Sequence, residues 1–431
     1  MSKIIVFSAD AMVGEDLKLL ETLPNYRRYL KDAAQITNVR SVYPSVTYPA
    51  HATMRTGCFP DKHGIVSNYK FLPGVFPNVW QWTNDALKCS DIFDAAKAAG
   101  KTTAGSLWPS TGCHPSIDYL IDECWGVPGG APVPEIFAEN GASGPVMEII
   151  NKNRHIIYGE RENASPWNEI FCVRCAADMI RAFQPDLLML HPANIDDYRH
   201  HTGVFSPEVT HGIHETDMMI GEIVEAAIDA GVWEDTNFFL VSDHGQRNIT
   251  RNIRLNRLFL ECGLIRRKKS GKLDYDAYSV SNGMSALVFL KDREDRTLFN
   301  RVYGTLKNLA ARKIYGFHQV FTVQETKEKY HLGGDFSFVL ESDGYSHFQD
   351  LLDGDFCVEK EDHADRHSGW ADHGYLPELG PQPILVAKGP DIRKNARLDG
   401  GHIVDEAPTY AEILGVKLQD IDGSSIDEIL R

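Results

Sequence analysis

The sequence predicts an α/β fold with a mostly parallel central sheet, flanked by helices, and an inserted α+β subdomain. Three observations lead to this prediction. Apolar runs alternate with helix-like segments along the first half of the chain, as in right-handed βαβ units. The first run, KIIVFSA at 3–9, is almost uninterrupted, which is typical of a strand buried on both faces. With 431 residues, the chain is also too long for one small core, which leaves room for an insert.

Further elements follow in the order that this fold requires. Apolar runs predict strands at 102–108, 186–194, 237–243 and 383–389. Helical patterns occur at 16–32, 90–99, 168–183, 208–230 and 405–414. The last strand and the last helix are expected to return to the main sheet.

The stretch at 253–368 has a different pattern. It contains two strand-like runs, SALVFLK and FSFVLES, on either side of a helix-like segment at 293–311. We therefore expect a catalytic domain formed by 1–252 and 369–431, with 253–368 as the inserted α+β subdomain. The Gly/Pro-rich GVPGGAPVP at 126–134 is expected to be a surface loop.

Composition and charge limit the class of protein. The formal net charge of −16 disfavours a protein that coats nucleic-acid polymers, and it means that an anionic substrate needs local positive charge such as bound metal ions. The eight cysteines are scattered, and Cys172 and Cys175 lie in a helical pattern typical of core packing. No signal peptide precedes the first strand and no apolar run has membrane-spanning length, so we expect a cytoplasmic protein without a membrane partner.

Three aspartates follow predicted strands directly or closely. Asp10 ends the first strand, Asp196 follows the run at 186–194, and Asp243 ends the run at 237–243. In parallel sheets the carboxyl ends of the strands form the edge where sites are built. A single aspartate in such a place is equally typical of a cap or turn, but three at one edge favour a site.

Histidines accompany these aspartates. Asp196 and His200 have the i, i+4 spacing that places two ligands on one helix face, although Asp197 and His201 have the same spacing. His244 directly follows Asp243, and His373 precedes a glycine. Carboxylate and imidazole ligands suit zinc, with manganese as an alternative. Three aspartates and three histidines are sufficient to hold two such ions, which can clamp the attacking and leaving oxygens of a phosphoryl displacement.

The candidate nucleophile lies in YPSVTYPAHATMRTG. Thr47 precedes a predicted helix at 48–55, so one interpretation is a plain N-cap. The other is functional, because a helix N-terminus favours phosphate and metal coordination activates a threonine hydroxyl. Ser45 is a nearby alternative nucleophile, and we expect His51 to be structural.

With these residues, the chain resembles the alkaline phosphatase superfamily, and within it the nucleotide pyrophosphatase/phosphodiesterase family. The most specific segment is PSVTYPAHATMRTGCFPDKHGIVSN at 44–68. The family has a similar Thr-x-Pro block, a Thr-Gly-x-x-Pro step and a His-Gly-Ile-x-x-Asn ending. The resemblance covers nearly the whole chain and implies an alkaline phosphatase-like fold.

The resemblance also implies roles for individual residues. Thr47 would attack phosphorus and form a phosphothreonine, while Asn68 and the Thr47 backbone N–H would bind a non-bridging phosphate oxygen. One zinc ion would be held by Asp10, Thr47, Asp243 and His244. The other would be held by Asp196, His200 and His373. A glycine three residues after the ligand histidine fits Gly203, which favours Asp196/His200 over Asp197/His201.

The sequence also departs from the family pattern. Arg199 replaces a frequent glycine, and Leu376–Pro377 replace an Asp-Asn pair. A sulfatase is excluded, because it needs Cys or Ser as nucleophile with an arginine four residues later, where this chain has Thr47 and His51. Further polar candidates near the site are expected to be a solvated loop or local structure: His363, Asp365, His367 and His402.

These observations predict a two-metal hydrolase of phosphodiester or pyrophosphate bonds in a small phosphate-containing substrate, with nucleotides as candidates. Asn68, Tyr69 and Lys70 are the predicted substrate-binding residues. The aromatic side chains that follow Asn68 would either line a pocket for the leaving group or have ordinary packing roles in the core or on the surface: Tyr69, Phe71, Trp80 and Trp82. A phosphonoacetate hydrolase or a phosphomonoesterase with the same metals is the alternative. A non-catalytic metal-binding protein on this fold is a further one, and it predicts a missing ligand or nucleophile.

Overall fold

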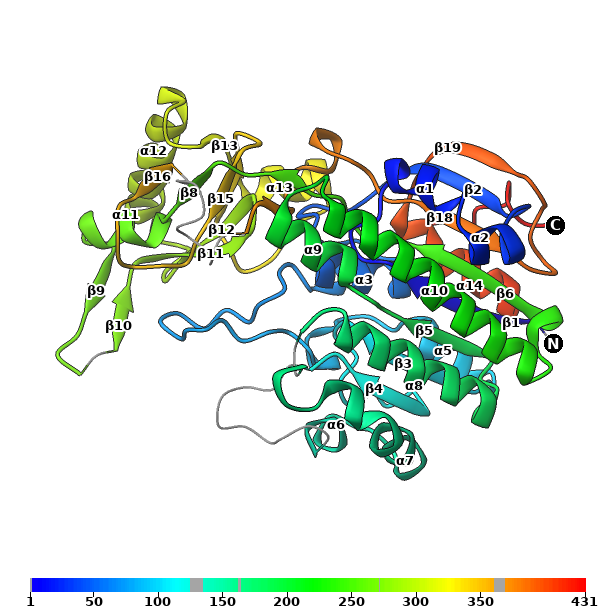
Figure 1. The fold of residues 1–431 in the computed structure, drawn as a ribbon. Helices are drawn as coiled ribbons and strands as arrows, with labels where there is room; N and C mark the ends of the chain where they lie inside the picture. Colours follow the sequence, from blue (N-terminus) through cyan, green and yellow to red (C-terminus); the bar gives the residue numbers. More distant parts are fainter. Residues whose placement is uncertain (1, 125–134, 162–163, 271, 360–368) are drawn as a thin grey trace.

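The computed structural model describes every residue except 1, 125–134, 162–163, 271 and 360–368. A twisted eight-stranded sheet forms the main body (Figure 1), in the order β19-β2-β18-β6-β1-β5-β3-β4. These strands are β1 (Lys3–Ser8), β2 (Ala34–Arg40), β3 (Thr103–Trp108), β4 (Tyr119–Asp122), β5 (Leu187–Leu190), β6 (Thr236–Val241), β18 (Leu385–Lys388) and β19 (Arg397–His402).

The sheet is mostly parallel, as predicted. β1 pairs in parallel with β5 and β6, and β3 pairs in parallel with β4 and β5. β18 runs antiparallel to both β6 and β2, and β19 is parallel to β2. The return of the last strand to the main sheet is therefore confirmed, with its direction reversed.

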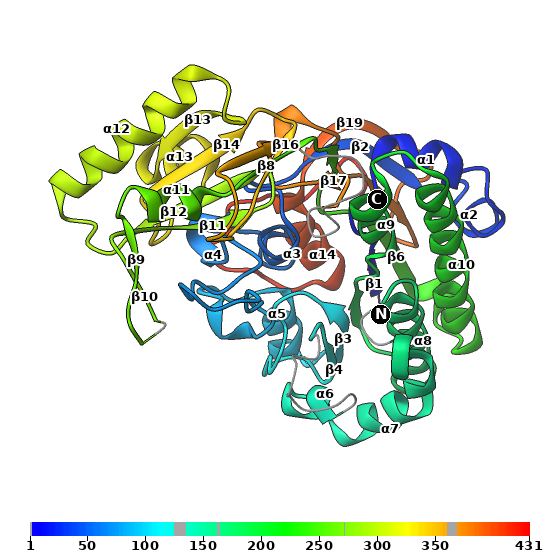
Figure 2. The ribbon, with the colours of Figure 1, turned by 60° about the vertical axis from the view of Figure 1, so that its left-hand side comes forward.

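Helices cover both faces of the sheet, because its central strands are apolar on both sides. Ile5 and Phe7 face one core, whereas Ile4 and Val6 face the other. The first core is covered by α1 (Gly14–Leu20), α2 (Pro24–Tyr29), α6 (Glu135–Glu139), α7 (Gly144–Asn153), α8 (Trp167–Phe183) and α10 (Pro207–Asp229). The second is covered by α3 (Thr47–Thr56), α5 (Ile92–Ala98) and α14 (Glu406–Leu414). Figure 2 shows the two helical layers on either side of β1 and β6.

Some element boundaries differ from the prediction for physical reasons. The helix predicted at 16–32 is two helices, because Pro24 starts a new one. The strand predicted at 186–194 ends at Leu190, and α9 (Asn194–Thr202) begins soon after it, so Asp196 lies on a helix. Three strands of the main sheet, β2, β4 and β19, were not predicted from the sequence. β19 reads RLDGGH and is largely exposed, so it has no apolar run.

The stretch after β6 builds separate sheets (Figure 1). Four antiparallel strands form its centre in the order β11 (Ala277–Asn282), β12 (Ser285–Leu290), β14 (Phe338–Ser342) and β13 (Phe317–Thr322). Three helices pack around them: α11 (Leu255–Glu261), α12 (Arg296–Arg312) and α13 (Val323–Tyr330). Short strands complete this part: β9 (Ile265–Arg267) with β10 (Leu273–Tyr275), and β8 (Arg251–Ile253) with β15 (Ser346–Phe348) and β16 (Cys357–Glu359). The limits 253–368 stay our prediction for this subdomain.

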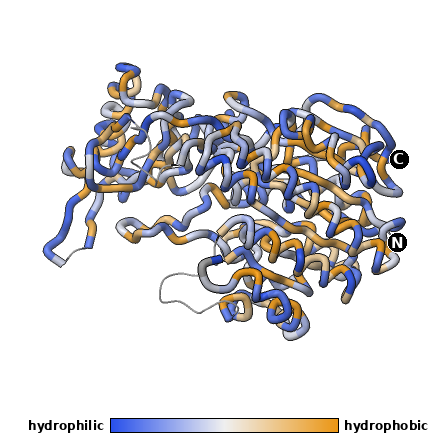
Figure 3. Tube along the Cα trace, viewed as in Figure 1, coloured by the Kyte–Doolittle hydropathy of each residue, from blue (hydrophilic) through white to orange (hydrophobic). Residues whose placement is uncertain are grey.

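Hydrophobic residues gather in the main sheet and in the helices packed on it, while the projecting β9–β10 hairpin is largely hydrophilic (Figure 3). Across the described parts of the chain, no helix is both long enough and apolar enough to cross a membrane. The loop predicted at 126–134 lies entirely outside the described residues.

Candidate active site

The carboxyl ends of three adjacent strands place the predicted metal ligands. β5, β1 and β6 are parallel neighbours, so the segments that follow them start at one edge of the sheet. Asp10 follows β1, Asp243 and His244 follow β6, and α9 with Asp196 and His200 follows β5. His373 comes from farther along the chain, directly after β17 (Ala371–Asp372), which pairs with β7 (Arg247–Asn248). This edge faces the inserted subdomain, near α3 and α9 (Figure 1).

The first ligand group is Asp10, Asp243 and His244, all buried. His244 Nε2 lies 3.1 Å from Asp243 Oδ2 and 3.6 Å from Asp10 Oδ1. Asp10 Oδ1 and Asp243 Oδ2 are buried without a hydrogen-bond partner. Burial raises the pKa of Asp10 well above its usual range, and the Asp196 carboxylate adds to this; burial and the Asp10 carboxylate do the same to Asp243. Two buried carboxylates side by side, each with one oxygen that has no hydrogen-bond partner, fit a divalent cation between them.

The second ligand group is Asp196, His200 and His373. Asp196 Oδ2 lies 3.2 Å from His200 Nε2, and Asp196 Oδ1 lies 3.9 Å from His373 Nε2. The Nδ1 atoms of both histidines face backbone carbonyls. His200 Nδ1 lies 2.8 Å from the Ala371 carbonyl, and His373 Nδ1 lies 3.2 Å from the Ser45 carbonyl. This is the outer arrangement that directs imidazole Nε2 toward a metal. Six donors in two groups of three thus fit two ions.

The ambiguous pair on α9 is resolved by exposure. The side chains of Asp197 and His201 are 41% and 66% exposed, and they pair with each other at 3.4 Å. Neither belongs to a ligand group in the described structure. Asp196 and His200 are therefore the members of this repeat that meet His373.

Thr47 is the first residue of α3 and is buried. The N-cap is Val46 and it makes no side-chain cap, so the interpretation of Thr47 as a plain cap is wrong. Thr47 Oγ1 instead lies 3.2 Å from His244 Nε2, at the first ligand group. Asn68 Oδ1 accepts a hydrogen bond from the Tyr48 N–H at 2.9 Å, which holds this amide beside the start of α3. The amide nitrogen of Asn68 is then available to an oxyanion.

The neighbouring polar residues are occupied in structural contacts. Ser45 Oγ donates to the Tyr375 carbonyl at 2.7 Å, so it is a poor candidate nucleophile. His51 is fully buried between the Thr47 carbonyl and Ser8 Oγ, which agrees with the structural role expected for it. His402 accepts from the Val404 N–H and contacts Phe59, again as expected.

The aromatic residues after Asn68 have two kinds of surroundings. Tyr69 packs edge-on against Trp80, and Trp80 packs against Tyr48, next to Thr47. Phe71 instead stacks on Phe289 in the inserted subdomain, and Trp82 packs against the main core. Tyr69 and Trp80 are thus the aromatics placed near the site. The Lys70 ammonium lies 3.5 Å from Thr83 Oγ1.

Arg199 is a site-supporting residue whose role the sequence did not reveal. Its guanidinium is fully buried and donates to both carboxylate oxygens of Asp16, at 2.7 and 2.8 Å, and to the Ala11 carbonyl. It therefore fastens α9, with Asp196 and His200, to the segment that follows Asp10. The only sequence signal was the departure from glycine.

His191 and Glu123 form a second buried polar pair next to Asp10 that was not predicted from the sequence. His191 Nε2 is 3.3 Å from Asp10 Oδ2 and 3.9 Å from Glu123 Oε1, and both side chains are buried. Burial raises the pKa of Glu123 to about 7. His191 lies within the run at 186–194, directly after β5, so the signal was present in a segment that the pattern had assigned to a strand.

Leu376 and the two closely spaced cysteines have structural roles. Leu376 packs in the core of the inserted subdomain, and its N–H donates to buried Glu341 at 3.1 Å. Cys172 and Cys175 are buried on α8, as expected. The cluster of His363, Asp365 and His367 lies outside the described residues.

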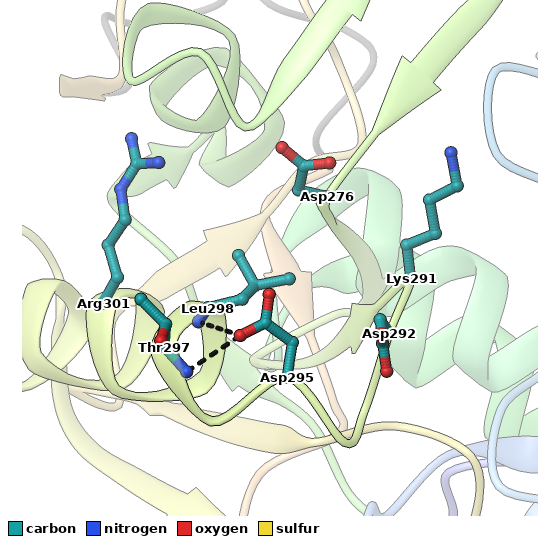
Figure 4. Close-up of a pocket in the computed structure, with 7 residues that line it drawn as sticks. All are labelled: Asp276, Lys291, Asp292, Asp295, Thr297, Leu298 and Arg301. Carbon is teal, nitrogen blue, oxygen red and sulfur yellow. Dashed lines mark hydrogen bonds between the residues drawn. The ribbon is translucent and has the colours of Figure 1, made fainter.

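A separate hollow of about 320 Å³ opens at the start of α12 (Figure 4). Asp295 already accepts the N–H groups of Thr297 and Leu298 there, so these donors are not available to an anion. None of the predicted site residues lines it. It is distinct from the metal centre.

Comparison with known proteins agrees with this geometry. A sequence model of the type I phosphodiesterase / nucleotide pyrophosphatase family matches residues 4–375. The chain belongs to this family. It is therefore a hydrolase of the phosphodiesterase/nucleotide pyrophosphatase class, a metal-dependent one.

Relatives match over nearly the whole chain. Human ectonucleotide pyrophosphatase/phosphodiesterase family member 5 is 22% identical over 98% of this chain and 76% of its own length. Human bis(5'-adenosyl)-triphosphatase ENPP4 is 21% identical over 98% of this chain and 80% of its own length. The solved structure of murine ENPP5, an inactive variant in complex with AMP, matches with a TM-score of 0.68 at 20% identity and covers both chains fully. These likenesses confirm the predicted fold.

Proposed function

We propose that this chain hydrolyses phosphodiester or phosphoanhydride bonds in small nucleotides, with two zinc ions and Thr47 as the nucleophile. The observation that carries the proposal is the position of Thr47 Oγ1, 3.2 Å from His244 Nε2 and thus at the first ligand group. Manganese is the alternative metal, because mixed carboxylate and imidazole ligands also suit it. When bound, the ions would lower the pKa of the threonine hydroxyl and neutralise charge on the phosphate oxygens.

The residues of the site have distinct proposed roles in catalysis and binding. Thr47 attacks phosphorus and forms a phosphothreonine, which carries the nucleotidyl group when the substrate is a nucleotide diester. The Asn68 amide, fixed by the Tyr48 N–H, donates to a non-bridging oxygen, together with the Thr47 N–H. Tyr69 and Trp80 offer an aromatic wall beside this point. The proposed ligands of the two ions are Asp10, Asp243 and His244, and Asp196, His200 and His373.

The names of the relatives favour a nucleotide as substrate. One is a bis(5'-adenosyl)-triphosphatase, and another was solved with AMP as an inactive threonine-to-alanine variant. A phosphonoacetate hydrolase or a phosphomonoesterase stays the alternative, in which Lys70 would bind the second acidic group. The non-catalytic alternative needs a missing ligand or nucleophile, and all of these residues are present.

The substrate class is tested by comparing kcat/KM for bis-p-nitrophenyl phosphate, p-nitrophenyl phosphate and phosphonoacetate. The proposal expects the diester to be preferred, and a preference for phosphonoacetate would replace it. Elemental analysis of the purified chain identifies the metals, and fewer than two per chain would contradict the two-ion site. A cytoplasmic location is also proposed, and cell fractionation tests it.

A further inference from the structure

A histidine from the inserted subdomain reaches the metal-binding edge. His347, on β15, hydrogen-bonds through Nδ1 to Asp372 Oδ2. Asp372 directly precedes His373 and is buried, and its Oδ1 accepts the His373 N–H at 2.7 Å. The same oxygen lies 4.0 Å from His373 Nε2, the ligand atom. One carboxylate thus joins His347 to the second ligand group.

The turn between β11 and β12 fixes this arrangement. The Met284 N–H donates to the His373 carbonyl at 2.7 Å, and the Phe348 N–H donates to the Gly283 carbonyl at 2.8 Å. A Cβ atom at Gly283 would lie 2.6 Å from Asp372 Oδ1 and 2.5 Å from the His373 carbonyl, so only glycine fits. The strand that carries His347 is therefore held directly against the ligand segment.

His347 has the geometry of an oriented proton carrier. An ionised carboxylate only accepts, so Nδ1 carries the proton toward Asp372 and Nε2 is left for exchange. No described residue hydrogen-bonds Nε2. Asp350, a second described carboxylate near this ring, accepts hydrogen bonds from the Asn78 amide and the Ser281 N–H, both at 2.7 Å. The His347 side chain is 18% exposed, so small molecules can reach it.

Through Asp372, His347 is linked to the second ligand group, which would lie on the departing side of the reaction. Thr47 lies at the first ligand group, and in an in-line displacement the leaving oxygen departs on the opposite side of phosphorus. Ions held by the two groups would neutralise charge on the attacking and leaving oxygens, so the second group is the one that would face the leaving oxygen. The second group is also the more open one, since the His200 side chain is 29% exposed whereas that of His244 is fully buried.

We propose that His347, oriented by Asp372, is a catalytic acid–base residue for the leaving group and for water. This inference rests on the proposed function. In the first step the Thr47 alkoxide forms the Oγ–P bond and the P–O bond to the leaving group breaks. The leaving oxygen takes the Nε2 proton of the His347 imidazolium, which becomes neutral and keeps its Nδ1 proton toward Asp372. In the second step water attacks phosphorus from that side and gives its proton to His347 Nε2. The P–Oγ bond then breaks and returns the alkoxide, which restores both residues.

This role is tested with two substrates that transfer the same nucleotidyl group but have different leaving groups. The dinucleotide TpT releases an alcohol that needs a proton, whereas p-nitrophenyl thymidine 5'-monophosphate releases a stable phenolate. In His347→Gln, kcat/KM for TpT should fall about 10²- to 10⁴-fold and that for the p-nitrophenyl ester less than about threefold. Because the second step loses its base, the ester should give a burst of about one p-nitrophenol per chain and a nucleotidyl adduct on Thr47.

Controls separate this role from a structural one. His318→Gln changes an exposed histidine of the same subdomain and should behave as wild type. Metal content of His347→Gln should stay at the wild-type value, and loss of metal would overturn the proposal in favour of a structural role. Equal losses for both substrates, or no adduct, would also overturn it. If Thr47→Ala retains full turnover, the proposed function itself fails; if Thr47→Ala is inactive and His347→Gln is normal, only this inference fails.

Discussion

Replacing Arg199 by methionine should destabilise the fold and loosen the metal centre. The guanidinium is fully buried, makes two hydrogen bonds to Asp16, and also donates to the Ala11 carbonyl. Methionine keeps much of the stem but leaves a buried carboxylate without its partner. Such a loss costs about 3–5 kcal/mol. Because Arg199 joins α9 to the segment after Asp10, metal affinity should fall as well.

Urea denaturation measures this loss of unfolding free energy, provided that the variant and the wild type have the same m-value. Metal titration measures the affinity. The double variant Arg199→Met/Asp16→Asn removes the orphaned charge, while the amide oxygen introduced at position 16 can still accept from the Val13 N–H, as the Asp16 carboxylate does. It should therefore be less destabilised than Arg199→Met alone, at a cost below about 2 kcal/mol. A single variant that costs less than about 1 kcal/mol, or additive effects in the double variant, would refute the reasoning.

The remaining predictions concern the site and its surroundings. Asn68→Ala should lower kcat about 10²- to 10³-fold, because one oxyanion donor is lost, and steady-state kinetics checks this. His200→Ala should lose a metal ion and at least about 100-fold in activity, whereas His201→Ala should change activity less than about twofold; elemental analysis and kinetics would show the reverse if the register were wrong. Burial raises the pKa of Glu341 from 4.5 to about 8, so it stays neutral in the fold while the unfolded chain ionises, and stability should fall as pH rises from 4.5 through 8. Glu341→Gln should flatten that dependence in denaturation curves measured across this range.

The sequence predicted the parts of the site that depend on strand ends. Asp10 and Asp243 follow apolar runs closely, and parallel strands bring such ends to one edge, so their proximity followed from local pattern. Asp196 was placed correctly near this edge although it lies on α9 and not at a strand end. The spacing alone did not distinguish His200 from His201, because each of them follows an aspartate by four residues. Their exposure separates them.

Contacts between distant segments were not predictable in the same way. His347 and Asp372 come from the inserted subdomain and the returning chain, and no local spacing links them. Arg199 was visible only as an unusual residue, and its partner Asp16 lies far away in sequence. β19 was missed because an exposed edge strand with two glycines has neither alternation nor an apolar run.

One measurement identifies the residue that accepts the phosphoryl group. The enzyme is mixed with p-nitrophenyl thymidine 5'-monophosphate, quenched in acid within the first turnover, digested and mapped by mass spectrometry. We expect a nucleotidyl group on Thr47 in wild type, a larger fraction in His347→Gln, and neither adduct nor turnover in Thr47→Ala. Full turnover in Thr47→Ala, or an adduct on Ser45 or any other residue, would contradict it.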